Sequence, residues 1–146
     1  MKEKPDTPAE LKTRALRFLV RREHSRAELV RKLAPHAESE AALNAVVDLL
    51  LSKKQLSDER FAEERARSLS RKYGTAKIRQ DLKERGVSQD IVDRVSSEGD
   101  LERARIILQK KYRNPASARE ELAKRARFLQ SRGFSYEVIR SVLKVE

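Results

Sequence analysis

The stretch from Leu56 to Val95, LSDERFAEERARSLSRKYGTAKIRQDLKERGVSQDIVDRV, decides the fold. Its first part, 57–73, places apolar residues about four positions apart, which is the spacing of one helix face. They are Phe61, Ala62, Ala66, Leu69 and Tyr73. A second helix over 76–85 is expected to end at Gly86, because glycine tolerates the left-handed conformation of a helix end. Ser88 then caps a short third helix, so the stretch predicts a three-helix unit.

The end of this unit occurs again later in the chain. Arg85–Val95 recurs as Arg132–Val142, a shift of 132 − 85 = 47 residues, with the glycine, the N-cap serine and the apolar positions in register. A weaker echo precedes the stretch in two leucines that match later apolar positions, Leu29 with Ile78 and Leu33 with Leu82. Such self-similarity is the signature of helical repeats.

The whole chain is predicted to be all-α, with three tandem three-helix repeats forming an elongated, curved helical array. Helix-forming residues dominate and no run shows the alternation of a strand. Charged residues are 39% of the chain and apolar residues 38%, so each repeat is expected to pack mainly on its neighbours. The expected divisions are a disordered tail over 1–7 and repeats over 8–56, 57–98 and 99–146.

Helix boundaries and inward faces follow from cap chemistry. Thr7 and Ser25 each begin a capping box, with a glutamate three residues later. Asp100 is expected to cap the seventh helix, and Asn114-Pro115 to start the eighth. In the third, seventh and eighth helices the side chains expected to face inward are Ala42, Val46, Leu49 and Leu50, then Leu101, Ala104, Ile107 and Leu108, and finally Ala118, Leu122, Ala126 and Leu129.

The net charge of +11, spread along the chain without a basic tail, favours a nucleic acid partner, or a protein partner that is acidic or already holds nucleic acid. The alternative is that the charge serves only solubility and salt-bridged helix faces. The absence of cysteine excludes disulfides and thiolate metal sites and fits the cytoplasm, which is the expected location. The polar first residues are unlike a signal peptide, and no apolar run approaches the roughly 20 residues of a membrane span.

No arrangement of residues in the sequence suggests catalysis. His24 and His36 have no second ligand at metal-binding spacing. The acidic pairs Asp58-Glu59 and Glu63-Glu64 have arginines four residues away, as in Arg60–Glu64, which is the spacing of surface ion pairs. A carboxylate paired in this way has a lowered pKa and is a poor general base. We therefore expect no enzyme, no cofactor and no metal.

Basic side chains are the candidates for partner binding. Three of them, Arg60, Arg67 and Arg71, are expected on one side of the 57–73 helix. The next helix adds Arg79 and Lys83. The third repeat adds Lys124, Arg125 and Arg127. Acidic residues interleave with the central set, which favours a protein partner over bare DNA. No aromatic side chain is placed as an obvious platform for stacking bases, and the tyrosines are expected to pack.

Three motifs resemble the RecX family, the bacterial modulators of RecA recombinase. Residues 15–33, ALRFLVRREHSRAELVRKL, are similar to the opening motif of that family. The run LSDERFA over 56–62 and the segment IRQDLKERGV over 78–87 are similar to the two motifs that follow. Ser57 stands where aspartate is usual, and 73–76 lacks the common Gly-Pro turn. The likeness covers about residues 12–144.

The resemblance implies a non-enzymatic regulator that binds the RecA filament assembled on single-stranded DNA. Such proteins are thought to lie in the filament groove or to block its growing end, which lowers ATP hydrolysis, strand exchange and coprotease activity. The chain is then expected to be a monomer that meets single-stranded DNA only indirectly or weakly. The runner-up is a free-standing basic helical DNA-binding protein. A helix lying on a membrane is disfavoured, since there is no interfacial tryptophan.

Overall fold

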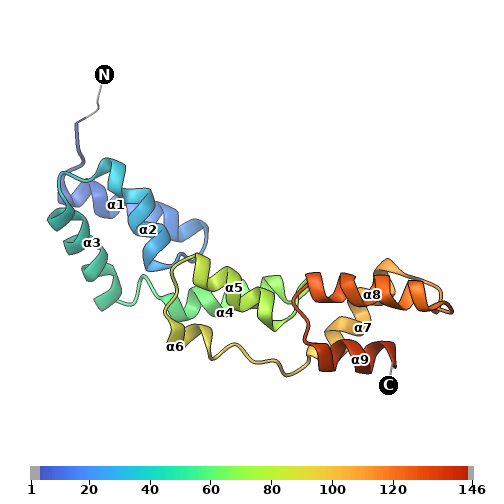
Figure 1. Cartoon of the computed structure of the whole chain (residues 1–146). Helices are drawn as coiled ribbons and strands as arrows, with labels where there is room; N and C mark the ends of the chain where they lie inside the picture. The colour runs from blue at the N-terminus through green and yellow to red at the C-terminus, as the bar shows by residue number, and fades with distance from the viewer. Residues whose placement is uncertain (1–3, 145–146) are drawn as a thin grey trace. The chain divides into compact units, whose positions relative to one another are not determined.

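A computed structural model describes residues 4–144, which contain α-helices, one 3-10 helix and no strand (Figure 1). The predicted all-α class is therefore confirmed. The described chain forms two compact units, one comprising residues 4–64 and 83–91 and the other residues 65–82 and 92–144. The second predicted repeat contributes to both units. Within residues 4–144 no helix is both long and apolar enough to cross a membrane.

The first unit is built on α1 (Pro8–Arg21), α2 (Arg26–Leu33), the 3-10 helix η1 (Ala34–His36) and α3 (Glu40–Ser52). Both predicted capping boxes are present, at Thr7 and at Ser25, where side chain and backbone satisfy each other's free hydrogen-bonding groups. The core of this unit consists of Leu11, Ala15, Leu29, Leu33, Leu43, Val46, Val47, Leu50 and Leu56.

The inward face predicted for α3 is partly wrong. Leu43 and Val47 are buried, while Leu49 is 39% exposed and Ala42 is only half-buried. The helix is apolar on nearly every side in its second half, so the periodicity does not fix which face turns inward. Packing against α1 and α2 decides the face.

The central stretch forms α4 (Asp58–Leu69), α5 (Thr75–Glu84) and α6 (Gln89–Val92). α4 is shorter than the predicted 57–73 helix, because the N–H groups of Lys72 and Tyr73 both turn back to the carbonyl oxygen of Leu69. Phe61 and Ala62 on α4 and Ile78 and Leu82 on α5 are buried, as their spacing predicts.

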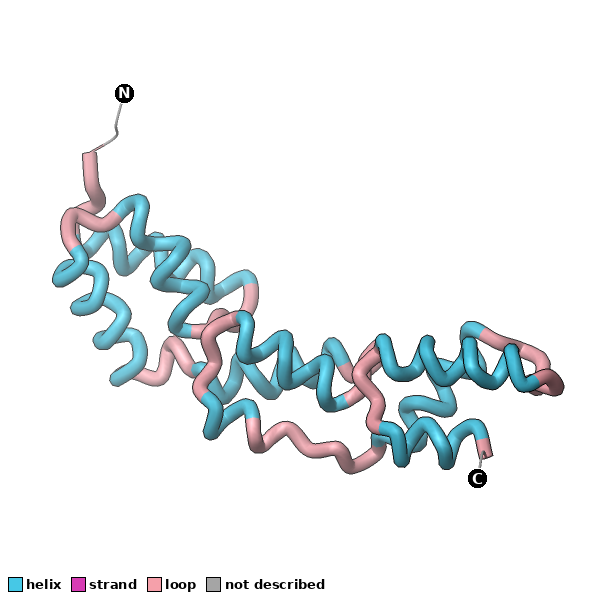
Figure 2. Tube along the Cα trace, in the orientation of Figure 1, coloured by secondary structure: helices cyan, strands magenta, loops and turns pink. Residues whose placement is uncertain are grey.

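The second unit holds α7 (Asp100–Lys111), α8 (Arg119–Ser131) and α9 (Tyr136–Leu143). Its core consists of Ala104, Ile107, Leu108, Leu129, Phe134 and Ile139. Ser135 caps α9 as predicted, accepting a hydrogen bond from the N–H of Val138. Figure 2 shows the loops that lead into α7 and α8 in pink.

Two predicted helix starts in the second unit are wrong. α8 begins at Arg119 with Ala118 as its N-cap, because the loop around Asn114 and Pro115 is not helical and the Asn114 carbonyl accepts a hydrogen bond from Arg125. Gly99, with φ +84°, is the N-cap of α7 in place of Asp100. The carboxylate of Asp100 instead accepts a hydrogen bond from the N–H of Thr75 at the start of α5. Leu101 is 37% exposed rather than inward.

The same backbone junction occurs once in each unit. In the first unit the Ser25 hydroxyl donates to the carbonyl oxygen of Arg85 at 2.7 Å, and a Cβ on Gly86 would lie 2.4 Å from Cβ of Ala27. Both Gly86 and its repeat-mate Gly133 have positive φ, +83° and +91°, which suits glycine. This is why an Arg-Gly pair recurs at a shift of 47.

The junction in the second unit joins the start of α5 to the end of α8. The N–H of Gly74 donates to the carbonyl oxygen of Arg132 at 2.8 Å, and that of Ala76 donates to Gly133 at 3.2 Å. A Cβ on Gly133 would lie 2.5 Å from the backbone nitrogen of Lys77. The end of one repeat's second helix thus packs against the start of the preceding repeat's second helix.

Candidate partner-binding surface

Arg60 and Lys83 belong to the first unit. The Nε of Arg60 donates to Oε1 of Glu23, which follows the end of α1, at 2.9 Å. Its ion-pair partner is therefore Glu23 and not Glu64, the residue that helix spacing predicts. Lys83, in the last turn of α5, is exposed and has no ion pair within residues 4–144. Of these two predicted contact residues, only Lys83 presents an uncompensated charge.

Arg67, Arg71 and Arg79 belong to the second unit. Arg67 is exposed near the end of α4, and Arg71 is exposed in the turn that follows, outside the helix. Arg79 is half-buried, and its Nη2 donates to the carbonyl oxygen of Val95 at 2.5 Å. Its Nε is buried with no partner in the described chain. The guanidinium of Arg79 thus holds the loop after α6, and only the other two face solvent.

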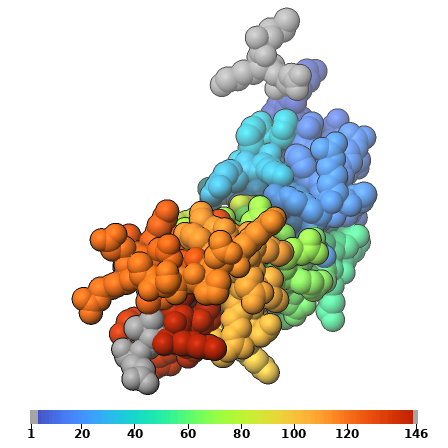
Figure 3. Space-filling view, turned by 90° about the vertical axis from the view of Figure 1, so that its right-hand side faces the viewer, coloured from blue at the N-terminus to red at the C-terminus, as the bar shows by residue number. Residues whose placement is uncertain are grey.

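Lys124, Arg125 and Arg127 lie on α8. Lys124 and Arg127 are exposed and no ion pair involves them in the described part of the chain. Arg125 is half-buried, because its guanidinium lies 4.6 Å from the centre of the Tyr112 ring and donates to Asn114. Figure 3 shows side chains of the segment from α7 to α8, in orange, at the surface of the second unit.

Arg125 belongs to an aromatic–cation cluster formed by Lys111, Tyr112, Arg125, Phe128 and Arg132. Tyr112 and Phe128 meet edge to face with ring centres 6.0 Å apart. Lys111 lies 4.6 Å and Arg132 5.1 Å from the Phe128 centre. Within residues 4–144 none of the three cations pairs with a carboxylate. The rings therefore hold three positive charges in place without neutralising them.

The cations around Glu28 in the first unit are, in contrast, compensated. The buried Glu28 carboxylate accepts hydrogen bonds from Arg22, from Nη1 of Arg85 at 2.8 Å, and from the N–H of Ser25. Burial by itself would raise the pKa of Glu28, but these hydrogen bonds and the charge of Arg22 outweigh it and lower the pKa from 4.5 to about 2. These ion pairs stabilise the first unit and neutralise the arginines, so they leave little positive charge to bind a polyanion.

His24 is buried beside the same cluster. Because a carbonyl can only accept, Nδ1 carries the proton and donates to the Arg22 carbonyl at 3.0 Å, while Nε2 accepts from Nζ of Lys32 at 2.9 Å. Burial is the main reason that the pKa of His24 is lowered, and the positive charges of Arg22 and Lys32 lower it as well. The hydrogen bond to the Arg22 backbone acts in the opposite direction but does not outweigh them. His24 is therefore a neutral structural residue, not a metal ligand.

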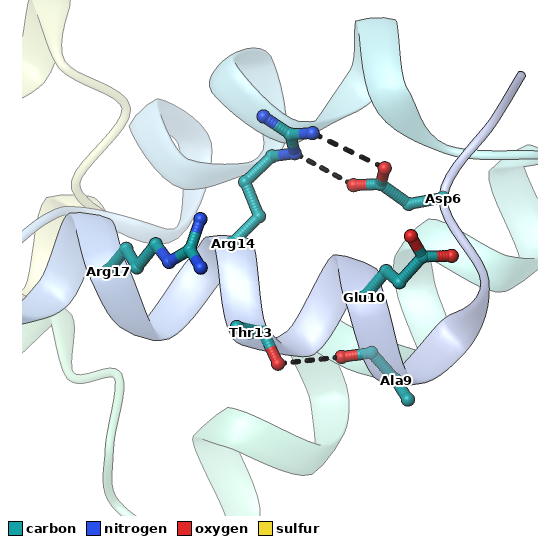
Figure 4. Close-up of a pocket in the computed structure, with 6 residues that line it drawn as sticks. All are labelled: Asp6, Ala9, Glu10, Thr13, Arg14 and Arg17. Carbon is teal, nitrogen blue, oxygen red and sulfur yellow. Dashed lines mark hydrogen bonds and ion pairs between the residues drawn. The ribbon is translucent and has the colours of Figure 1, made fainter.

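Two pockets lie on the first unit. One, of about 280 Å³, is polar and is bordered by Asp6, Glu10, Arg14 and Arg17 (Figure 4). The other, of about 300 Å³, is an apolar hollow between α1 and α3 that is lined largely by alanines and Leu49. Neither contains a catalytic constellation, and no group of three acidic or histidine side chains within residues 4–144 is arranged to hold a metal ion.

The aromatic–cation cluster is the feature that sequence reasoning missed. Phe128 on α8 and Arg132, the C-cap that directly follows it, are spaced four apart, which places them on one side of the helix end and was a usable signal. Tyr112 and Lys111 come from the end of α7, and no local pattern predicts that they meet α8.

Comparison with known families decides what kind of protein this is. Three family models match in order: the first three-helix domain of RecX over residues 12–50, the second over 57–95 and the third over 98–143. The chain belongs to the RecX family. The resemblance that the three motifs suggested is thus confirmed, together with the tandem three-helix domains.

Relatives in the RecX family share most of the chain. Regulatory protein RecX of Ralstonia nicotianae is 40% identical over 143 residues, which cover 96% of this chain and 90% of that relative. Regulatory protein RecX of Chromobacterium violaceum is 46% identical over 135 residues, covering 91% and 88%. These relatives are named as regulators, and the chain belongs to a family of regulatory proteins.

Solved structures show the same fold. The crystal structure of RecX from Lactobacillus salivarius matches with a TM-score of 0.83 at 20% identity, covering 94% of both chains. A second crystal structure of a regulatory protein RecX matches with a TM-score of 0.76 at 22% identity, covering 95% of this chain and 74% of the other. At this identity the likeness concerns the RecX fold alone.

Proposed function

We propose that this chain binds the RecA filament assembled on single-stranded DNA and inhibits its activities: ATP hydrolysis, strand exchange and coprotease function. Membership of the RecX family over all three helical domains carries the proposal. The chain acts as a binding regulator in the cytoplasm, as a monomer, and not as an enzyme. Its working divisions are the three repeats over 8–56, 57–98 and 99–146.

The distribution of uncompensated charge supports a filament of protein and DNA as the partner. The chain carries a net charge of +11, while in the first unit Glu28, Glu23 and Asp6 neutralise nearby arginines. The aromatic–cation cluster in the second unit has no such compensation. A surface of this kind attracts polyanions. It is suited to the phosphates of a DNA strand that a partner protein already holds.

The eight basic residues named from the sequence divide by their contacts into two groups. Arg67, Arg71, Lys83, Lys124 and Arg127 are exposed without an ion pair in the described chain, and they form the contact set that we propose. Arg60, Arg79 and Arg125 already bind Glu23, Val95 and Asn114, so their contribution to partner binding is secondary. Substituting the second group would also disturb the fold, so the first group gives the cleaner test.

Single-stranded-DNA-dependent ATP hydrolysis by RecA, titrated with this protein, tests the proposal. We expect inhibition at fewer than one molecule per RecA protomer, with weak binding to the same DNA when RecA is absent. Tight binding to naked DNA without any effect on RecA would reject the filament as partner and support the free-standing DNA-binding alternative.

A further inference from the structure

Tyr136, the first residue of α9, holds its aromatic ring in solvent. It is 73% exposed, whereas Tyr73 and Tyr112 are half-buried. The expectation that the tyrosines pack is therefore wrong for Tyr136. The reason is that α9 packs through the side that carries Ile139 and Val142, and Tyr136 lies outside that side.

The fold does not require an aromatic residue at this position. Repeats two and three align at a shift of 132 − 85 = 47, and repeats one and two at 78 − 29 = 49. The residues aligned with Tyr136 are therefore Gln89, since 136 − 47 = 89, and Glu40, since 89 − 49 = 40. All three are exposed, and each is the first residue of the third helix of its repeat. Because two repeats fold with a polar residue here, packing does not explain the ring in the third.

Arg140 accompanies the ring. Its guanidinium carbon lies 5.5 Å from the centre of the Tyr136 ring, within the range of a cation–π contact. The aligned residues in the other repeats are Asp93, since 140 − 47 = 93, and Asn44, since 93 − 49 = 44, so this pair is particular to the third repeat. Arg140 lies over one face of the ring, and the high exposure of Tyr136 leaves the opposite face open to a flat ligand.

The ring lies in the most basic part of the chain. Residues 110–144 contain ten lysines and arginines and three acidic residues, which gives 10 − 3 = +7 of the net charge of +11. The aromatic–cation cluster belongs to the same segment, and its member Arg132 comes four residues before Tyr136. An open aromatic face is thus combined with a concentration of positive charge that attracts polyanions.

An unpaired nucleotide is the ligand that uses both features. Its base stacks on an aromatic face, and its phosphate is attracted by the cations nearby, as in proteins that bind single-stranded nucleic acid without sequence preference. A duplex keeps its bases stacked on one another and offers none to the ring. Tyrosine and arginine are also common in protein interfaces, but there they lie in well-packed, desolvated surroundings. The neighbours Ser135 and Glu137 are polar and exposed, which favours the nucleotide.

We infer that Tyr136 stacks on an unpaired base of single-stranded DNA, with Arg140 steadying the ring and the cations of residues 110–144 close to the phosphates. The part of this contact in regulation rests on the proposed function, because the strand concerned is then the one inside the RecA filament. The contact itself is a property of this chain and DNA, so it can be tested without RecA.

Fluorescence anisotropy of a labelled single-stranded oligonucleotide at low salt, without RecA, measures the contact. We expect Tyr136→Ala to weaken binding by at least about fivefold and Tyr136→Phe, which keeps an aromatic face, to bind like the unchanged chain. Gln89→Ala is the matched control, because it alters the same helix position in the second repeat, and it should leave the affinity unchanged. Tyr136→Ala removes no charge, so the slope of log affinity against log salt should stay the same.

An abasic oligonucleotide of the same length separates stacking from charge. It keeps the phosphates and lacks the bases, so the unchanged chain and Tyr136→Ala should bind it equally. A loss of equal size on both oligonucleotides would overturn the inference, as would equal affinity of the unchanged chain and Tyr136→Ala for the ordinary oligonucleotide. No measurable binding by the unchanged chain would overturn it too. Circular dichroism checks that each variant keeps its helices.

RecA-dependent ATP hydrolysis distinguishes failure of this inference from failure of the proposed function. If Tyr136→Ala binds the oligonucleotide normally but no longer inhibits RecA, the ring contacts protein, and the inference is overturned while the proposed function stands. If Tyr136→Ala loses oligonucleotide binding as expected while the unchanged chain has no effect on RecA, the stacking contact stands and the proposed function is rejected.

Discussion

Nη1 of Arg85 donates to Oε2 of Glu28 at 2.8 Å, although 57 residues separate them in the sequence. Arg22 binds the same carboxylate, and the Ser25 hydroxyl binds the carbonyl of Arg85, so side chain and backbone of Arg85 both contact α2 and its N-cap. Because the end of α5 is fixed in this way, it belongs to the first compact unit rather than to the second.

Glu28→Gln is expected to lower the free energy of unfolding by about 1–3 kcal/mol, because two guanidinium groups lose their charged acceptor. The loss stays in this range since the side chains of Arg22 and Arg85 are 41% and 33% exposed and water takes over part of the interaction. Urea denaturation at neutral pH measures it. Glu23→Gln is the control: it removes the more exposed ion pair with Arg60 and should cost less than about 1 kcal/mol. Equal losses would contradict the central role of Glu28.

The stability of the first unit is expected to fall in acid through the same carboxylate. The pKa of Glu28 is about 2 in the folded chain against 4.5 unperturbed, so between these values the unfolded chain binds more protons. The stabilisation is complete above about pH 4.5 and is lost as the pH falls towards 2. Unfolding free energies measured by urea denaturation at pH 5, 4 and 3 should decrease less steeply in Glu28→Gln than in the unchanged chain. Parallel curves would show that other groups carry the acid sensitivity.

Gly86→Ala and Gly99→Ala separate backbone strain from steric clash. Both glycines have nearly the same φ, +83° and +84°, so both changes cost about 1–2 kcal/mol for the left-handed conformation. A Cβ on Gly86 would also lie 2.4 Å from Cβ of Ala27, whereas on Gly99 it would meet only the flexible end of Arg103 at 3.4 Å. Gly86→Ala should therefore lower the free energy of unfolding by about 1–3 kcal/mol more than Gly99→Ala does. Its thermal unfolding midpoint should be correspondingly lower. Equal midpoints would mean that the chain around Gly86 and Ala27 shifts enough to relieve the clash at little cost.

Local chemistry explains what the sequence predicted well. The caps at Thr7, Ser25 and Ser135 and the helix ends at Gly86 and Gly133 depend on residues within a few positions of each other, and all five are found. The repeat at a shift of 47 is also readable, because the same junction imposes the same glycine and the same cap each time it occurs.

The errors arise where distant residues decide the outcome. Asp100 looks like an N-cap for its own helix, yet its carboxylate accepts a hydrogen bond from Thr75 on another element. Arg79 has the spacing of a surface arginine, yet its guanidinium binds the carbonyl of Val95. In both cases the local pattern is sound, and a tertiary contact uses the side chain differently. The aromatic–cation cluster depends on α7 meeting α8 and could not be found for the same reason.

Charge reversal at two exposed residues of α8 is the sharpest test of the contact set. Lys124→Glu with Arg127→Glu changes the net charge by −4, from +11 to 11 − 4 = +7, and neither side chain has an ion pair to lose in the described chain. We expect binding to RecA filaments on single-stranded DNA to weaken by about tenfold or more, with the effect reduced at high salt because ions screen exposed charges.

Arg17→Glu with Arg31→Glu is the matched control for this last prediction. It makes the same change in net charge on exposed residues of α1 and α2, outside the proposed contact set. Binding can be followed by fluorescence anisotropy of labelled protein at two salt concentrations, with circular dichroism to confirm that both double variants keep their helices. If the two variants lose affinity equally, net charge alone drives binding, and α8 has no special place in it. A loss confined to the α8 variant would assign the filament-facing side of the second unit to Lys124, Arg127 and the adjoining aromatic–cation cluster.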